Sequence, residues 1–263
     1  MTRGLSIIIY GTEGVGKTTF ALQFKKELKC ISLMENGFEN LEMVGDVPEN
    51  CDNFDVDSYP ELLKEIRSAK DYSTLIIDSM SGMQQVMTNH LLETTFKQYD
   101  NPELAFSSFS TGYKQHMPLL AEQVANELTL LNKKGINTII IGHVRNETVK
   151  NPTGQDYNAA VIDMESWPRA IFTKWASAVL YMTLDLEVMV TKTWKGKATE
   201  AKARQELEED SDRIMYTTKN PSHSAKNLLH LPPYISLGDS PQEAYSRFIS
   251  KLPPQLQEAQ KQA

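Results

Sequence analysis

The chain has few cysteines and no long apolar runs, and both absences narrow the possible classes of protein. It has only two cysteines, Cys30 and Cys51, and they form no C-x-x-C pair. Neither a disulfide framework nor a zinc site is therefore indicated, and a reducing cytoplasm is the expected setting. No apolar run approaches the length of a membrane span, so we expect no membrane partner. The first apolar run, 5–10, is too short for a secretory signal.

Positive charge is also scarce. The chain carries 27 Lys and Arg residues against 34 Asp and Glu residues, which gives a net charge of −7 at pH 7. This balance excludes a uniformly basic nucleic-acid binder, so any contact with nucleic acid has to come from a local patch or loop. The 263 residues, 40% of them hydrophobic, suit one α/β domain with elaborations or one domain plus a small appendage.

The most informative stretch is a short apolar strand followed by a glycine-rich turn and a helix. Gly11, Gly16, Lys17 and Thr18 fit the P-loop pattern G-x-x-x-x-G-K-[ST]. The glycines let backbone N–H groups turn toward phosphate oxygens, and the helix directs its positive end at the same phosphates. In this motif the lysine contacts the β- and γ-phosphates and the threonine hydroxyl binds Mg²⁺. The predicted nucleotide-binding residues are Gly11, Thr12, Glu13, Gly14, Val15, Gly16, Lys17, Thr18 and Thr19. The alternative is a glycine-rich turn without a ligand.

A second acidic signal follows a buried strand at 74–77. This strand ends at Asp78, as a Walker B strand does, and the carboxylate would lie across from Thr18 and hold Mg²⁺ directly or through water. The alternative is that Asp78 caps the helix that follows.

The rest of the chain alternates between strands and helices. The expected strands are 5–10, 30–34, 54–56, 74–77, 138–141, 178–184, 188–193 and 213–218. The expected helices are 17–28, 60–70, 82–96, 118–134, 167–175 and 241–252, with a charged helical segment at 196–210. We expect an irregular stretch at 99–116, a polar loop at 144–165 and a frayed polar tail from 253.

The order of these features resembles the RecA-like ATPase core over about residues 4–235. The resemblance rests on the P-loop, a strand ending in Glu35, a strand ending in Asp78 and a strand ending in Gly142-His143. More narrowly, the chain resembles phage-encoded RecA-core proteins of the AAA-type nucleotide-binding group, some of which act in single-strand annealing or recombination.

The resemblance implies an α/β P-loop NTPase fold with a RecA-like core. That fold has a mostly parallel central sheet flanked by helices, and here we expect a C-terminal β-rich extension as well. The implied domains are a core at 1–235, with a charged insertion at about 196–211, and a C-terminal helix with a flexible tail at 236–263.

The resemblance also implies roles for two polar residues at strand ends. Glu35 occupies the place of the glutamate that activates the attacking water, and a carboxylate near the γ-phosphate is chemically suited to that work. Its alternatives are a solvated turn residue and the nearby rival base Glu39. His143 lies where the family carries a polar γ-phosphate sensor, and its alternative is a hydrogen-bonded histidine at the sheet edge. With Lys17, these residues are the predicted catalytic group.

Two segments, about 98–116 and 144–165, match the positions of the loops that touch single-stranded DNA in RecA-like proteins. Aromatic side chains for base stacking and cations for phosphates suit such loops. The predicted DNA-binding residues are Phe109, Tyr113, Lys114, Arg145 and Lys150. The alternative is ordinary surface loops or subunit contacts.

RecA-like enzymes often complete the site with a cation from a neighbouring subunit. Ala225-Lys226-Asn227 resembles the start of a Lys-Asn-Arg-Phe-Gly motif in the RadA group, but Leu228-Leu229 follows it here. Lys226 is the first candidate for a trans-acting cation, with Arg213 or Lys219 as others. The alternative is a solvated basic loop.

These features together predict an ATP- and Mg²⁺-dependent ATPase of DNA recombination or single-strand annealing. The partners implied by the resemblance are single-stranded DNA, further copies in a ring or filament, and a phage or host single-strand-binding protein, in the host cytoplasm. One alternative is a nucleotide-gated scaffold with little turnover that acts on protein partners. Another is a small-molecule kinase, for which 196–210, with Arg204 as its single arginine, is the only candidate lid.

Overall fold

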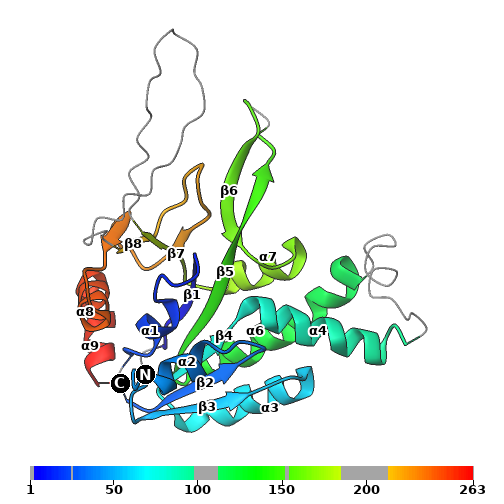
Figure 1. Cartoon of the computed structure of the whole chain (residues 1–263), viewed down its shortest axis with the longest axis horizontal. Helices are drawn as coiled ribbons and strands as arrows, with labels where there is room; N and C mark the ends of the chain where they lie inside the picture. The colour runs from blue at the N-terminus through cyan, green and yellow to red at the C-terminus, as the bar shows by residue number, and fades with distance from the viewer. Residues whose placement is uncertain (1–2, 25, 98–111, 152–153, 185–212, 263) are drawn as a thin grey trace.

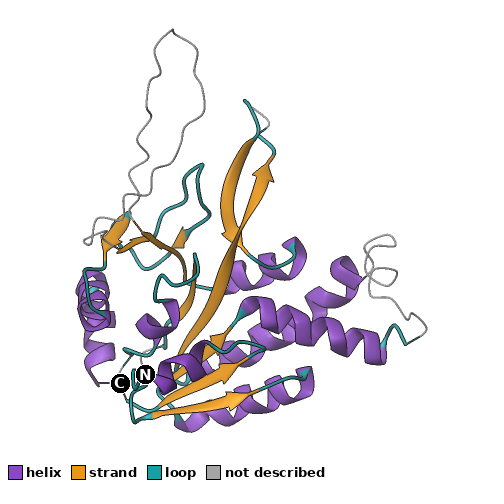
Figure 2. Ribbon diagram, viewed as in Figure 1, coloured by secondary structure: helices purple, strands orange, loops and turns teal. Residues whose placement is uncertain are grey.

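The computed structural model describes residues 3–24, 26–97, 112–151, 154–184 and 213–262. Within these residues the chain forms a ten-stranded sheet with helices on both faces (Figures 1 and 2). The strands are β1 (Ser6–Gly11), β2 (Leu28–Ser32), β3 (Cys51–Asp55), β4 (Thr74–Asp78), β5 (Asn137–Val149), β6 (Tyr157–Ile162), β7 (Ala178–Leu184), β8 (Arg213–Tyr216), β9 (Lys226–Asn227) and β10 (Tyr234–Ser236).

The strand order along the sheet is β10-β8-β7-β1-β5-β4-β2-β3, with β6 beside β5 and β9 beside β7. From β7 to β3 every neighbouring pair is parallel. Strands β8, β9 and β10 add antiparallel pairs at the other edge. The expected α/β class with a mostly parallel sheet is therefore confirmed, and the strands extend beyond the core on the C-terminal side.

The helices divide between the two faces of the sheet. They are α1 (Lys17–Ala21), α2 (Gly37–Met43), α3 (Tyr59–Ser68), α4 (Met80–Thr94), α6 (Met117–Lys133), α7 (Ser166–Trp175), α8 (Pro241–Lys251) and α9 (Pro254–Gln262), with a 3-10 turn at Ala69–Asp71 and a π-helical turn at Gly112–His116. Each face of the sheet has its own hydrophobic core. Alternate residues of β1 pack into one core or the other, because successive side chains of a strand point to opposite faces. Ile8 packs with α3, α4, α6 and α7, whereas Ile7 packs with α1 and α8. No helix of the described residues is long and apolar enough to cross a membrane.

The helix after the P-loop is shorter than the sequence predicts. We expected it to reach residue 28, but α1 ends at Ala21 and β2 already begins at Leu28. Phe20 and Phe24 still face inward, where Phe20 meets Phe248 of α8 edge-on at 5.6 Å. Aromatic packing against α8 therefore buries this segment without a longer helix.

The end of the chain also differs from the expected frayed tail. Residues 254–262 form α9, and the side chain of Gln260 is buried against Asn137 at the start of β5. The two amides exchange hydrogen bonds of 2.9 and 3.1 Å. This pairing holds α9 on the sheet, although the division into domains at residue 235 stays a prediction.

The expected polar loop at 144–165 is wrong over most of its length. Strand β5 continues to Val149 and turns back as β6, which forms a long antiparallel hairpin that projects from the sheet (Figure 1). The base of the hairpin is held by the buried Tyr10, whose hydroxyl donates to the carbonyl of Ala160 at 3.1 Å. The expected strand at 188–193 and the charged segment at 196–210 lie outside the described residues.

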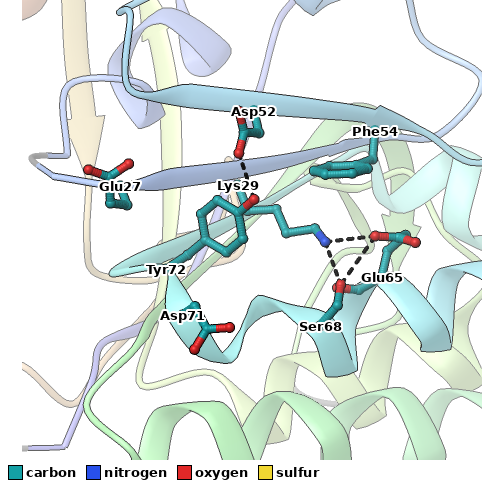
Figure 3. Close-up of a pocket in the computed structure, with 8 residues that line it drawn as sticks. All are labelled: Glu27, Lys29, Asp52, Phe54, Glu65, Ser68, Asp71 and Tyr72. Atoms are coloured by element: carbon teal, nitrogen blue, oxygen red, sulfur yellow. Dashed lines mark hydrogen bonds and ion pairs between the residues drawn. The ribbon is translucent and has the colours of Figure 1, made fainter.

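A buried ion pair ties α3 to β2, toward the amino ends of the strands. The Lys29 ammonium lies 2.7 Å from Glu65, 2.6 Å from the hydroxyl of Ser68 and 4.0 Å from the centre of the Phe54 ring. Figure 3 shows these groups in an open pocket of about 460 Å³. The pocket is lined by Glu27, Lys29, Asp52, Phe54, Glu65, Ser68, Asp71 and Tyr72. Lys29 is buried, donates to Glu65 and Ser68 and lies over the Phe54 ring, so the pair is part of the framework of the fold.

Replacing Lys29 with methionine should lower the free energy of unfolding by about 3–5 kcal/mol at pH 7, because it leaves the Glu65 carboxylate buried without its closest partner. Chemical denaturation measures this. Lys64→Met is the matched control: Lys64 also lies 3.1 Å from Glu65 but is exposed, so about 0–1 kcal/mol is expected. An equal loss for both variants would contradict the argument.

The same pair predicts a pH dependence. The hydrogen bond from Lys29 is the main cause of a lowered pKa at Glu65, so the stabilisation is present above the unfolded-state pKa of the carboxyl group. It is lost as the pH falls through the folded-state pKa. The difference in stability between wild type and Lys29→Met should therefore shrink in acid.

Candidate functional site

The P-loop lies at the carboxyl end of β1, in the middle of the sheet. Gly14 and Gly16 have φ angles of 70° and 90°, a left-handed conformation that glycine adopts readily. The Lys17 ammonium is buried and donates to the carbonyls of Gly11 at 3.0 Å and Thr12 at 2.8 Å. Burial lowers the pKa of Lys17, and nearby carboxylates, Asp78 first among them, oppose this shift. A buried cation whose hydrogen bonds, among the described residues, go to carbonyls of a glycine-rich turn is suited to bind an anion.

Gly11 has a second reason to be glycine that the motif does not reveal. Strand β7 runs beside β1, and a Cβ atom on Gly11 would lie 1.9 Å from the carbonyl oxygen of Met182. The turn into the P-loop therefore depends on a close approach of two backbones.

Thr18 and Asp78 face each other across this turn. The Thr18 hydroxyl donates to Oδ2 of Asp78 at 2.7 Å, and Asp78 is buried at the end of β4. Burial raises the pKa of Asp78, and the hydrogen bond from Thr18 opposes the shift. A Cβ on Gly37 would lie 3.7 Å from both oxygens, an ordinary contact distance, so the start of α2 lies beside the pair. A hydroxyl and a carboxylate at this spacing are oxygen ligands of the kind that Mg²⁺ takes, so the residues present fit the ion.

The structure brings Glu35 and His143 together, as their places at strand ends predict. Glu35 follows β2 and His143 lies on β5, with β4 between them in the sheet. Nε2 of His143 lies 2.9 Å from Oε1 of Glu35. The rival base, Glu39, is exposed on α2. No hydrogen bond among the described residues connects it to Glu35 or His143.

Sequence reasoning missed Ser79. This buried residue, not Asp78, is the N-cap of α4, because its side chain accepts a hydrogen bond from the N–H of Gly82. Its hydroxyl also donates to Oε1 of Glu35 at 2.7 Å. A serine directly after the strand and three residues before Gly82 is a recognisable capping signal that could have found it.

The predicted DNA-binding residues are scattered among different environments. Phe109 lies outside the described residues, Tyr113 lies in the π-helical turn, and Lys114 is exposed there. Arg145 lies on β5, not in a loop, and Lys150 pairs with Asp156 at 2.6 Å.

Arg145 is also surrounded by carboxylates. Its guanidinium group lies 3.4 to 3.7 Å from acidic side chains of β5 and of the segment after β6, namely Glu147, Asp163 and Glu165. The positive charge of the hairpin is therefore largely balanced by its own chain.

The predicted trans-acting cations also have partners within the chain. The Lys226 ammonium donates to the carbonyls of Thr173, Lys174 and Ala176 at 2.9, 2.9 and 2.6 Å, where it caps the C-terminal end of α7. The solvated basic loop expected as the alternative is wrong at this position. Arg213 lies on β8 and donates to the carbonyl of Asp239 at 3.4 Å, whereas Lys219 is exposed. Arg204, the only arginine of the candidate kinase lid, lies outside the described residues.

The fold and this site have the features of the P-loop class of proteins: a glycine-rich turn after β1 and a buried carboxylate at the end of β4. The chain belongs to the AAA_24 family, an AAA domain, whose model matches residues 3–229. No curated protein resembles the sequence closely enough to count as a match.

Solved structures that resemble the chain include the RadB recombinase, with a TM-score of 0.45 and 12% identity over 92% of this chain and 90% of that one. Another is a KaiC-like protein from Pyrococcus horikoshii OT3, with a TM-score of 0.41 and 15% identity over 91% and 88% of the two chains.

Proposed function

We propose that this protein binds and hydrolyses ATP with Mg²⁺. The observation that carries the proposal is the convergence of Lys17, the Thr18–Asp78 pair and Glu35 at the carboxyl ends of β1, β4 and β2. Lys17 would hold the β- and γ-phosphates, and Thr18 and Asp78 would hold the ion. When bound, Mg²⁺ would neutralise charge that develops on the phosphate oxygens. Glu35 would orient the attacking water and accept its proton.

His143 would connect this chemistry to the rest of the molecule. It contacts Glu35 and lies on β5, the strand that continues into the projecting hairpin. Loss of the γ-phosphate changes the surroundings of Glu35, and the His143 contact offers a route by which the hairpin would respond. We propose this sensor role on the contact alone.

We further propose that the ATPase acts on single-stranded DNA, in recombination or annealing. The projecting β5–β6 hairpin and the exposed Lys114 support a DNA contact. Assembly into a ring or filament, a single-strand-binding partner, a phage origin and a cytoplasmic setting stay predictions, as does a trans-acting role for Lys226 or Arg213.

A second candidate is a nucleotide-gated scaffold that acts on protein partners. The balanced charge of the hairpin favours it, because Arg145 and Lys150 are paired with carboxylates and so offer little to phosphates.

ATP turnover with and without single-stranded DNA, at moderate salt, separates the two candidates. For a recombination ATPase we expect turnover to rise with single-stranded DNA and to rise less as salt increases, because phosphate contacts release counterions. Duplex DNA of the same length is the control. A turnover rate that is the same with and without DNA would favour the scaffold. Tight ATP binding without turnover would contradict the proposed ATPase.

A further inference from the structure

Ser79 caps α4, and it also lies close to the polar residues of the candidate site. It follows Asp78 at the end of β4, which lies between the strands that carry Glu35 and His143. Its side chain is fully buried, and its oxygen meets three groups: Oε1 of Glu35 at 2.7 Å, Oγ of Ser81 at 2.8 Å and the N–H of Gly82 at 3.4 Å.

The donors and acceptors in this cluster can be assigned from chemistry. An ionised carboxylate only accepts, so the single hydroxyl proton of Ser79 is committed to Glu35. Ser79 then accepts from the N–H of Gly82, and the Ser81 hydroxyl donates to Ser79. By the same reasoning, Nε2 of His143 carries the proton that reaches Glu35.

Both donors converge on one oxygen of Glu35. Ser79 and His143 bind Oε1, whereas no described residue donates to Oε2. A glutamate side chain has several rotatable bonds, and two donors from neighbouring strands remove much of that freedom. Oε2 is left as the carboxylate oxygen available to a water molecule.

We propose that Ser79 is a positioning residue for Glu35: with His143 it fixes Oε1 and so orients Oε2 toward the attacking water. This inference rests on the proposed ATPase function. Within the described part of the chain, the hydrogen bonds of Ser79 go to Glu35, Ser81 and Gly82 and not to the P-loop, so its effect falls on the hydrolytic step and not on nucleotide binding.

Ser79→Ala should lower kcat about 10- to 100-fold, the range expected for loss of a hydrogen bond to a charged group, and leave KM for ATP near the wild-type value. Ser81→Ala is the matched control, because it also removes a hydroxyl from the start of α4 but leaves the Ser79–Glu35 bond. It should remain close to wild type. If Ser79→Ala proves unstable, Ser79→Gly removes the same hydroxyl with a smaller loss of capping.

A double-mutant cycle decides whether Ser79 acts through Glu35. In single-turnover hydrolysis, Ser79→Ala should add little to the defect of Glu35→Gln, because the group that it positions is already gone. The same loss of rate in both backgrounds would overturn the positioning role and leave only the helix cap. An active wild type with normal turnover in Ser79→Ala and Ser79→Gly would also overturn it. An inactive wild type would overturn the proposed ATPase, and the role of Ser79 would fall with it.

Discussion

Replacing Lys17 with alanine should reduce ATP hydrolysis by about 10³-fold or more and weaken ATP binding as well. The ammonium is buried at the turn that we propose as the phosphate site, where a positive charge would oppose the charge that develops on the transferred phosphoryl group. Its hydrogen bonds in the part of the chain that the structure describes go to the Gly11 and Thr12 carbonyls, so the fold should survive the change. Equilibrium binding of ATP and steady-state turnover measure the two effects.

Lys133→Ala provides the matched control for this experiment. It removes an exposed lysine at the far end of α6 and should leave binding and turnover unchanged. Normal hydrolysis by Lys17→Ala would mean that the turn after β1 is not the phosphate site, and the proposed function would have to be abandoned.

Glu35→Gln should lower turnover by about 10²–10⁴-fold while ATP binding persists. The amide has the size of the carboxylate and still offers an oxygen to Ser79 and His143, but it cannot accept a proton from water. A variant that binds ATP and hydrolyses it very slowly is the expected outcome, and trapping of unhydrolysed nucleotide after rapid gel filtration would detect it.

Glu39→Gln tests the rival base, which lies on α2 shortly after Glu35. Glu39 is exposed on α2, so its replacement should leave turnover near the wild-type rate. A large loss in Glu39→Gln together with normal turnover in Glu35→Gln would move the base to Glu39.

The central part of the site could be predicted because parallel strands bring their carboxyl ends to one edge. Glu35, Asp78 and His143 are far apart in the chain, yet Glu35 follows β2, Asp78 ends β4 and His143 follows the buried apolar part of β5, and these strands are neighbours in the sheet. The strand ends, read with the resemblance to the RecA-like core, therefore predicted that these residues lie together. Ser79 could have been recognised as the cap of α4, but its bond to Glu35 depends on the direction of one hydroxyl group, which no pattern of residue types reports.

The errors have physical causes of a different kind. The β5–β6 hairpin was taken for a loop because the outer part of β5 is polar and half-exposed, and the buried apolar part of β6, 159–162, is short. Helix α1 was predicted too long because Phe20 and Phe24 have helical spacing, whereas the contact with α8 buries them in a shorter segment. Lys226 looked like a solvated cation because the carbonyls that it caps belong to α7, about fifty residues earlier.

The central place of β1 in the sheet has a consequence for how the protein is made. Strand β1 leaves the ribosome first, but its two neighbours begin only at Asn137 and Ala178. Pairings between such distant segments form late, because the intervening chain must be closed into a loop before the contact is gained. The phosphate-binding turn is thus held in shape by parts of the chain that do not yet exist when it is synthesised. Nascent fragments that stop before β7 would carry the complete motif and still offer ATP no finished site.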